Sequence, residues 1–236
     1  MNAQEPLQEF LARKRVLDSP ETGTAAFVAR LRDLRVWQSA RLARTYQDFR
    51  EDARYLPAVE FFLSDLYGPQ DFTDRNRDLE RAWRYLKRAL PQILMRVLEN
   101  AIELEVLTLE LDHAMVHALT TGPVTEITYA AAYRRVNNRT SRTRQIDLIV
   151  RIGEDLTRIV SRTWIGPLLH AGHIAAHAAG FGVLQDFLER GYSAFRQMGA
   201  AERLLKAVRE RETHFMLAMF AANETPHGAA LEHGHE

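Results

Sequence analysis

The chain of 236 residues contains no cysteine. Without thiols it cannot form disulfides, thiolate zinc sites or cysteine nucleophiles. The sequence also lacks an excess of charge of either sign, because 31 basic residues balance 31 acidic ones. A protein with no net charge exerts no general attraction on nucleic acids or anionic lipids, so we expect neither nucleic acid nor membrane as a partner.

Several familiar signals are missing as well. The first ten residues contain two acids and no apolar stretch, whereas a secretory signal needs one, so we expect a cytoplasmic protein. The sequence contains no phosphate-binding glycine loop and no Gly-x-Ser-x-Gly motif. The usual signatures of nucleotide-binding proteins and serine hydrolases are therefore absent.

What the sequence does contain is helical periodicity along nearly its whole length. This pattern predicts an all-α fold, a multi-helix bundle of about nine helices, several near 30 residues long and mostly antiparallel to their neighbours. We expect one all-helical domain over residues 1–222 and a disordered, histidine-containing tail over 223–236.

Two long helices are expected, over residues 24–53 and 92–120, because their apolar residues keep a helical spacing throughout. Thr125 and Ser141 are expected to cap two further helices, since both side chains can accept a hydrogen bond from the first turn. Asn137 and its neighbour should separate these two helices.

Residues 163–185 contain no Asp, Glu, Lys or Arg. The segment is long enough to cross a bilayer. It holds three histidines, four glycines and a proline, however, and few large apolar side chains, which makes a membrane span unfavourable. We therefore predict a buried helix at the centre of the protein or at a seam between subunits.

The three histidines of this segment, His170, His173 and His177, are spaced by three and four residues. This spacing places them on one face of a helix, where neutral imidazoles could bind a metal ion or a haem iron. The alternative is that they occupy a groove and bind neighbouring carbonyls or acids. Neither the metal nor the cofactor can be identified from the spacing alone.

Two acids, Glu105 and Asp112, fall on the apolar face of the helix expected over 92–120. A buried acid must be paired or protonated, so one interpretation is an ion pair with an arginine. The other is a polar pocket that binds a ligand. The arginines available for pairing lie in one arginine-rich turn, Arg134, Arg139, Arg142 and Arg144. Without interleaved aromatic residues, this turn is more typical of a helix corner that neutralises acids than of a nucleic-acid site.

The stretch Phe61–Gly68 resembles the signature of a bacterial group known as FFLEELY-motif proteins, with Ser64 and Asp65 in place of two glutamates. Residues 129–134 and 180–191 resemble later stretches of the same group. The resemblance implies no particular activity, and the group's pattern does not feature the three histidines. Tyr67, Tyr133 and Arg134, which lie in these stretches, join Glu105 and Asp112 as candidate ligand-binding residues.

These observations leave two hypotheses about function. The first is a non-enzymatic interaction or ligand-binding module that forms a homo-oligomer. The second is a helical-bundle enzyme or carrier that holds a metal, a haem or a small apolar ligand through His170, His173 and His177.

Overall fold

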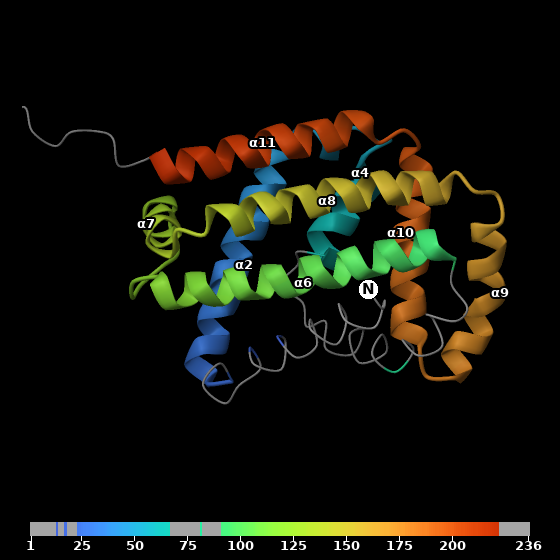
Figure 1. Ribbon diagram of the computed structural model, residues 1–236, viewed down its shortest axis with the longest axis horizontal. Helices are drawn as coiled ribbons and strands as arrows, with labels where there is room; N and C mark the ends of the chain where they lie inside the picture. The colour runs from blue at the N-terminus through green and yellow to red at the C-terminus, as the bar shows by residue number, and fades with distance from the viewer. Residues whose placement is uncertain (1–12, 14–16, 18–22, 67–80, 82–90, 222–236) are drawn as a thin grey trace, which may run out of the picture.

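The computed structural model of the chain describes residues 13, 17, 23–66, 81 and 91–221 (Figure 1). These residues form helices and contain no strand, which confirms the prediction of an all-α fold with about nine helices. Tyr67 and the expected tail over 223–236 lie outside the described residues.

Three long helices lie side by side and form a layer: α6 (Gln92–Ala118), α8 (Arg139–Val160) and α11 (Glu202–Ala221) (Figure 1). The central helix, α8, runs antiparallel to both neighbours. Leucines and isoleucines at helical spacing fill the interface between α6 and α8, among them Leu111 and Leu148, which are fully buried. The helix expected over 92–120 is thus found within two residues of its predicted ends.

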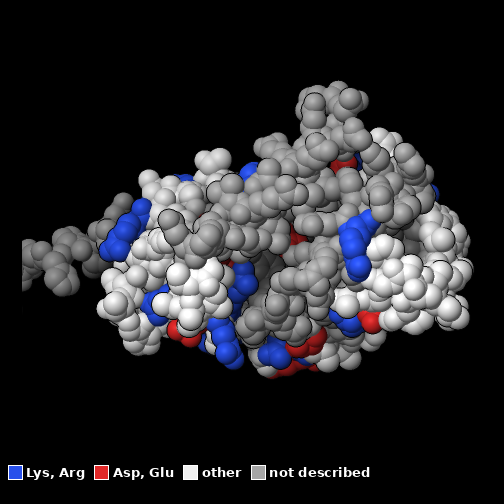
Figure 2. Space-filling model, turned by 90° about the horizontal axis from the view of Figure 1, so that it is seen from below, with Lys and Arg blue, Asp and Glu red and all other residues white. Residues whose placement is uncertain are grey.

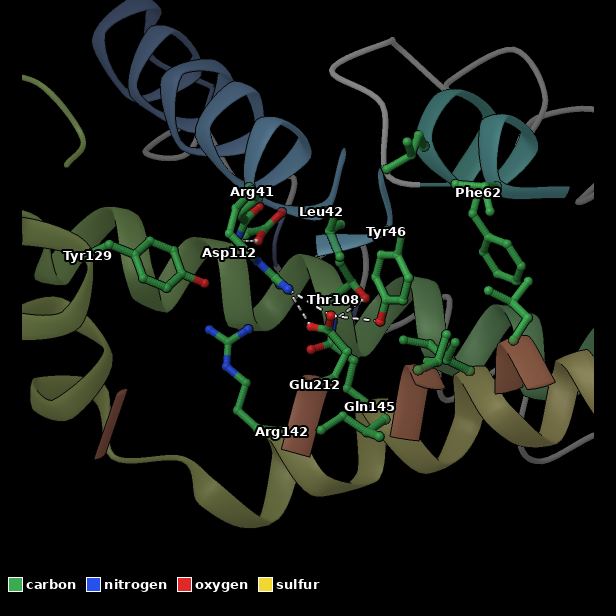
Figure 3. Close-up of a pocket in the computed structure, with 17 residues that line it drawn as sticks. Arg41, Leu42, Tyr46, Phe62, Thr108, Asp112, Tyr129, Arg142, Gln145 and Glu212 are labelled. Carbon is green, nitrogen blue, oxygen red and sulfur yellow. Dashed lines mark hydrogen bonds and ion pairs between the residues drawn. The ribbon is translucent and has the colours of Figure 1, made fainter. Parts of the chain in front are cut away.

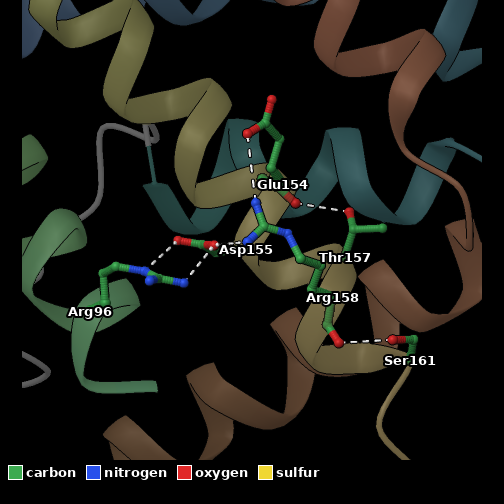
Figure 4. A network of polar contacts seen from close by, with 7 residues as sticks. Arg96, Glu154, Asp155, Thr157, Arg158 and Ser161 are labelled. Atoms are coloured by element: carbon green, nitrogen blue, oxygen red, sulfur yellow. Dashed lines mark hydrogen bonds and ion pairs between the residues drawn. The ribbon is translucent and has the colours of Figure 1, made fainter. Parts of the chain in front are cut away.

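A buried acid ties α6 to α8 (Figure 4). The side chain of Asp155 is buried and lies 2.9 Å from Arg158 on the same helix and 3.3 Å from Arg96 on α6. Because both arginines reach the surface, their outer edges stay in water while the carboxylate is fully compensated.

The helix α2 (Ala25–Thr45) crosses this layer (Figure 1). The prediction of one helix over 24–53 is wrong, because the chain leaves helical geometry at Tyr46 before the short helix α3 (Gln47–Arg50). The break lets the side chains of Tyr46 and Phe49 both enter the core, and the Tyr46 hydroxyl donates a hydrogen bond to Glu212 on α11.

The helix α7 (Glu126–Val136) begins as predicted, since the Thr125 hydroxyl accepts a hydrogen bond from the backbone N–H of Thr128. Asn137 ends it in the left-handed conformation, with φ of 49°. The expected cap at Ser141 is wrong. Asn137 already reverses the chain, so α8 begins at Arg139, directly after Asn138.

Beside the layer, α4 (Leu56–Phe61) continues into η1 (Phe62–Leu66), a short π-helix. The helix α10 (Gly182–Met198) packs on α4. A glycine is needed where they meet, because a Cβ atom at Gly191 would lie 2.8 Å from the ring of Phe61. The Phe-Phe-Leu stretch therefore serves as packing between α10 and the rest of the protein.

The uncharged segment forms α9 (Ile165–Ala178), which lies at one end of the molecule beside α10 (Figure 1). The prediction of a buried central helix is wrong: Ile165 is the one buried residue of α9, and Leu168 and Ile174 are exposed. In Figure 2 this end of the molecule is drawn mostly in white, because it carries few charged side chains. Within the described part of the chain, we find no helix with the length and apolar character of a bilayer span.

Candidate functional site

A pocket of about 110 Å³ lies between α2, α4, η1, α6, α7, α8 and α11 (Figure 3). Apolar side chains form one part of its wall and polar or charged side chains form the other. The apolar residues are Leu42, Val59, Phe62, Leu63, Ile146, Ile149, Leu204 and Val208. The polar and aromatic residues are Gln38, Arg41, Tyr46, Thr108, Asp112, Tyr129, Arg142, Gln145 and Glu212.

An ion pair between Arg41 of α2 and Glu212 of α11 lies at the pocket wall. The Arg41 Nη1 atom lies 2.7 and 2.8 Å from the two carboxylate oxygens of Glu212. The Tyr46 hydroxyl donates to the same carboxylate at 2.9 Å. Glu212 therefore has two charge-assisted partners, and its negative charge is matched by Arg41.

These contacts fix the protonation states of Tyr46 and Arg41. Burial raises the pKa of the Tyr46 phenol well above its ordinary range, and the negative charge of Glu212 raises it further. Burial also acts against the charged form of Arg41, but the attraction and hydrogen bonds of Glu212 outweigh it and raise the pKa of the guanidinium. Tyr46 is thus a neutral donor and Arg41 a permanent cation.

Asp112, which was singled out in the sequence, is 2 % exposed and lines the same pocket. Its carboxylate accepts hydrogen bonds of 3.1 Å from Arg35 and from Gln38, both on α2. The expectation that one of the arginines between residues 134 and 144 pairs with it is wrong. Arg134 lies on α7 and the other three arginines lie on α8, whereas α2 crosses α6 directly at Asp112.

Arg142 is the one buried arginine of the described chain, with 6 % of its surface exposed. Its guanidinium lies over the ring of Tyr133, 4.7 Å from the ring centre. Its Nε and Nη2 atoms are buried and have no hydrogen-bond partner among the described residues. Figure 3 shows Arg41 and Arg142 extending from opposite walls toward the same interior space.

A neighbouring arginine shows what the free edge of Arg142 can bind. Two residues further along α8, Arg144 uses its own Nε and Nη2 atoms to bind the two oxygens of Glu103 at 2.7 Å each. This side-on arrangement is the geometry with which guanidinium binds a carboxylate. Arg142 also lines the pocket, and its own Nε and Nη2 atoms are buried without such a partner among the described residues.

The other residues proposed from the sequence lie in different places. The ring of Tyr133 is buried below Arg142, and burial raises the pKa of its phenol. Arg134 donates to the backbone carbonyl of Met219 at 3.3 Å, outside the pocket. Glu105 is half-buried and does not line the pocket.

The histidines of α9 are far from this pocket and form a second cluster with acids of α10. His173 Nδ1 lies 3.0 Å from Glu189, and His177 Nε2 lies 2.8 Å from Asp186. The structure does not bring the exposed His170 into this cluster.

Sequence reasoning missed Arg41, Tyr46 and Glu212, and it noticed Arg142 only as a pairing partner. A signal for two of them exists. Arg142 stands four residues before Ile146, and Glu212 stands four residues after Val208, so each charge lies on the apolar stripe of its helix. The same criterion selected Asp112.

These observations define the class of protein as an all-α bundle with a mixed polar and apolar pocket between its helices, lined by one arginine that has no ionic partner among the described residues. The chain belongs to the family described as "Domain of unknown function (DUF8198)", whose model matches residues 19–226. No curated protein and no solved structure matches the chain significantly.

Proposed function

We propose that the protein is a non-enzymatic binding module whose pocket takes a small monoanionic ligand, a carboxylate with a short apolar group. The observation that carries this proposal is that the buried Nε and Nη2 atoms of Arg142 have no hydrogen-bond partner in the part of the chain that the structure describes. A buried guanidinium with two unsatisfied N–H groups is costly, and a bound anion would remove that cost.

Charge counting in the pocket supports a single negative charge on the ligand. Glu212 compensates Arg41, and Arg35 compensates Asp112, so among the described residues the positive charge of Arg142 is the one without a counter-charge. One carboxylate on the Nε–Nη2 edge would neutralise it with two parallel hydrogen bonds.

Size and lining support a short ligand. An engineered cavity of about 150 Å³ holds benzene, so the space of about 110 Å³ here suits roughly four to six non-hydrogen atoms. The apolar wall, with Leu42 and Ile146 near the charged groups, would contact a short alkyl chain. Propionate and butyrate are the probes that fit this description.

The test is a thermal denaturation series with propionate and butyrate, matched for ionic strength with chloride. We expect the carboxylates to raise the melting temperature of the natural protein, since a ligand that binds only the folded state stabilises it. Arg142→Met should lose about 2–5 kcal/mol of binding free energy, because it removes the buried charge that faces the ligand.

Arg144→Met is the matched control, since Arg144 lies on the same helix and binds Glu103 instead of facing the pocket. It should keep the response to carboxylates. An equal response in Arg142→Met, or no response in the natural protein, would refute the proposal.

We further propose that a second copy of the chain covers α9. The support is exposure: a helix without charge presents Leu168 and Ile174 to solvent, and the Ile174 side chain is 81 % exposed. Two copies of a charge-free surface do not repel each other electrostatically, and the chain as a whole has no net charge.

Light scattering after size exclusion tests this second proposal. We expect the natural chain to have twice the monomer mass of 27.1 kDa and Ile174→Glu to have the monomer mass, because two buried glutamates would face each other. Ile127→Glu is the control, since Ile127 is equally exposed but lies on α7. A monomeric natural chain at all concentrations would contradict the proposal.

A further inference from the structure

The contact between α9 and α10 brings four metal-binding side chains together outside the pocket. His173 and His177 are four residues apart on α9, and Asp186 and Glu189 are three residues apart on α10. Each spacing places both members on one face of their helix. The two faces meet, because α9 and α10 pack against each other.

The donor atoms already lie close to the positions that a metal ion requires. One donor atom each from His173, His177 and Asp186 lie within 4.8 Å of one another. Glu189 lies beside this group and contacts one of its members, since both of its oxygens lie 3.0–3.1 Å from His173 Nδ1. In a tetrahedral zinc site, donor atoms at about 2.0–2.1 Å from the ion are about 3.3 Å apart. An ion would be admitted by side-chain rotations that bring the donors of this group and Glu189 to that separation.

The local backbone and a buried neighbour hold two of these groups in place. The His177 ring lies against Gly182, where a Cβ atom would lie 2.6 Å from Nδ1, so only glycine leaves room for the imidazole. Gln185 is buried and donates to Glu189 at 2.8 Å and to the carbonyl of Leu169 at the same distance. Such a contact orients a carboxylate as outer partners do in metal sites.

The charge of Glu189 also suits a cation. The hydrogen bond from Gln185 is the main cause that lowers the pKa of the Glu189 carboxyl, and His173 adds to it. Two ionised carboxylates and two neutral imidazoles would neutralise a divalent ion completely. Nitrogen and oxygen donors in this combination suit Zn²⁺ among the common divalent ions.

We propose that His173, His177, Asp186 and Glu189 bind one Zn²⁺ ion that joins α9 to α10. On binding, the imidazole nitrogens that face the acids use their lone pairs for the metal, and the proton of each neutral imidazole sits on its other ring nitrogen. The ion would stabilise a helix with little other attachment, since Ile165 is the one buried residue of α9.

Zinc titration of the full chain by isothermal calorimetry tests the proposal. Histidines outside α9 can also bind zinc, so every variant in the comparison retains them. We expect one tight site in the natural chain and a loss of about 100-fold or more in its affinity in His177→Ala and in Asp186→Asn. Asp186→Asn keeps the shape of the side chain, so lost affinity there cannot be attributed to unfolding of α9.

His170→Ala is the matched control, because His170 lies on the same helix but outside the cluster. It should bind zinc as the natural chain does. Hydrogen exchange gives a second measurement: zinc should slow exchange of the α9 amides in the natural chain and in His170→Ala alone. Equal zinc affinity in Asp186→Asn and the natural chain, or no tight site in either, would show that the cluster consists of histidine–carboxylate hydrogen bonds only.

Discussion

Glu212→Ala is expected to lower the free energy of unfolding by about 3–5 kcal/mol, as removal of one partner from a buried ion pair does. The Glu212 side chain is 12 % exposed and is the carboxylate that binds Arg41. Without it, Arg41 and Arg142 would be two unpaired cations on one pocket, and the Tyr46 hydroxyl would lose its acceptor. Urea denaturation followed by circular dichroism measures the loss.

Glu210→Ala is the control for this variant. Glu210 lies on the same helix, is largely exposed and pairs with Lys206 at 3.8 Å, so its loss should change stability by less than about 1 kcal/mol. Formate should restore part of the stability of Glu212→Ala beyond the effect of chloride, because it replaces the missing carboxylate. If formate and chloride act equally, the loss comes from packing and not from charge.

The features that could be predicted from the sequence are those with a local cause. The start of α7 at Thr125 and its end at Asn137 depend on side chains within three residues of each terminus. The length of α6 follows from apolar spacing that continues over 27 residues. Such local signals do not depend on contacts with distant segments of the chain.

The features that could not be predicted depend on distant partners. The helix over 24–53 breaks at Tyr46 because that side chain reaches Glu212, which is 166 residues away in the sequence. The partner of Asp112 is 77 residues away on α2, so helical spacing could indicate that the acid is buried but not which arginine binds it. The pocket combines side chains from seven helices and has no sequence motif of its own.

The exposure of α9 has a different explanation. Absence of charge usually accompanies burial, and that expectation led to a central helix. The segment is rich in alanine and glycine, however, and such small side chains bury too little apolar area to draw a helix into a core. Polar contacts of His173 and His177 with α10 hold it instead, at the end of the molecule.

Phe195→Ala is expected to cost about 3–5 kcal/mol of unfolding free energy, the usual range for a phenylalanine removed from a well-packed core. Phe195 on α10 is 1 % exposed and belongs to the cluster that joins α10 to α3, α4 and α11. Its ring meets Phe62 edge to face, with centres 5.9 Å apart. Val183→Ala on the same helix is the control, and it should cost less than about 1 kcal/mol because Val183 is exposed.

Phe62→Ala separates packing from ligand binding. Phe62 is half-buried and lines the pocket, whereas Phe195 does not, so its truncation should cost less stability, about 1–2 kcal/mol, and enlarge the pocket. Because the added space is apolar, the preferred ligand should become longer, from butyrate toward hexanoate, while Phe195→Ala keeps the natural preference. Equal losses of stability in the two variants would show that Phe62 is as deeply packed as Phe195. An unchanged preference in Phe62→Ala would mean that its ring does not contact the bound anion.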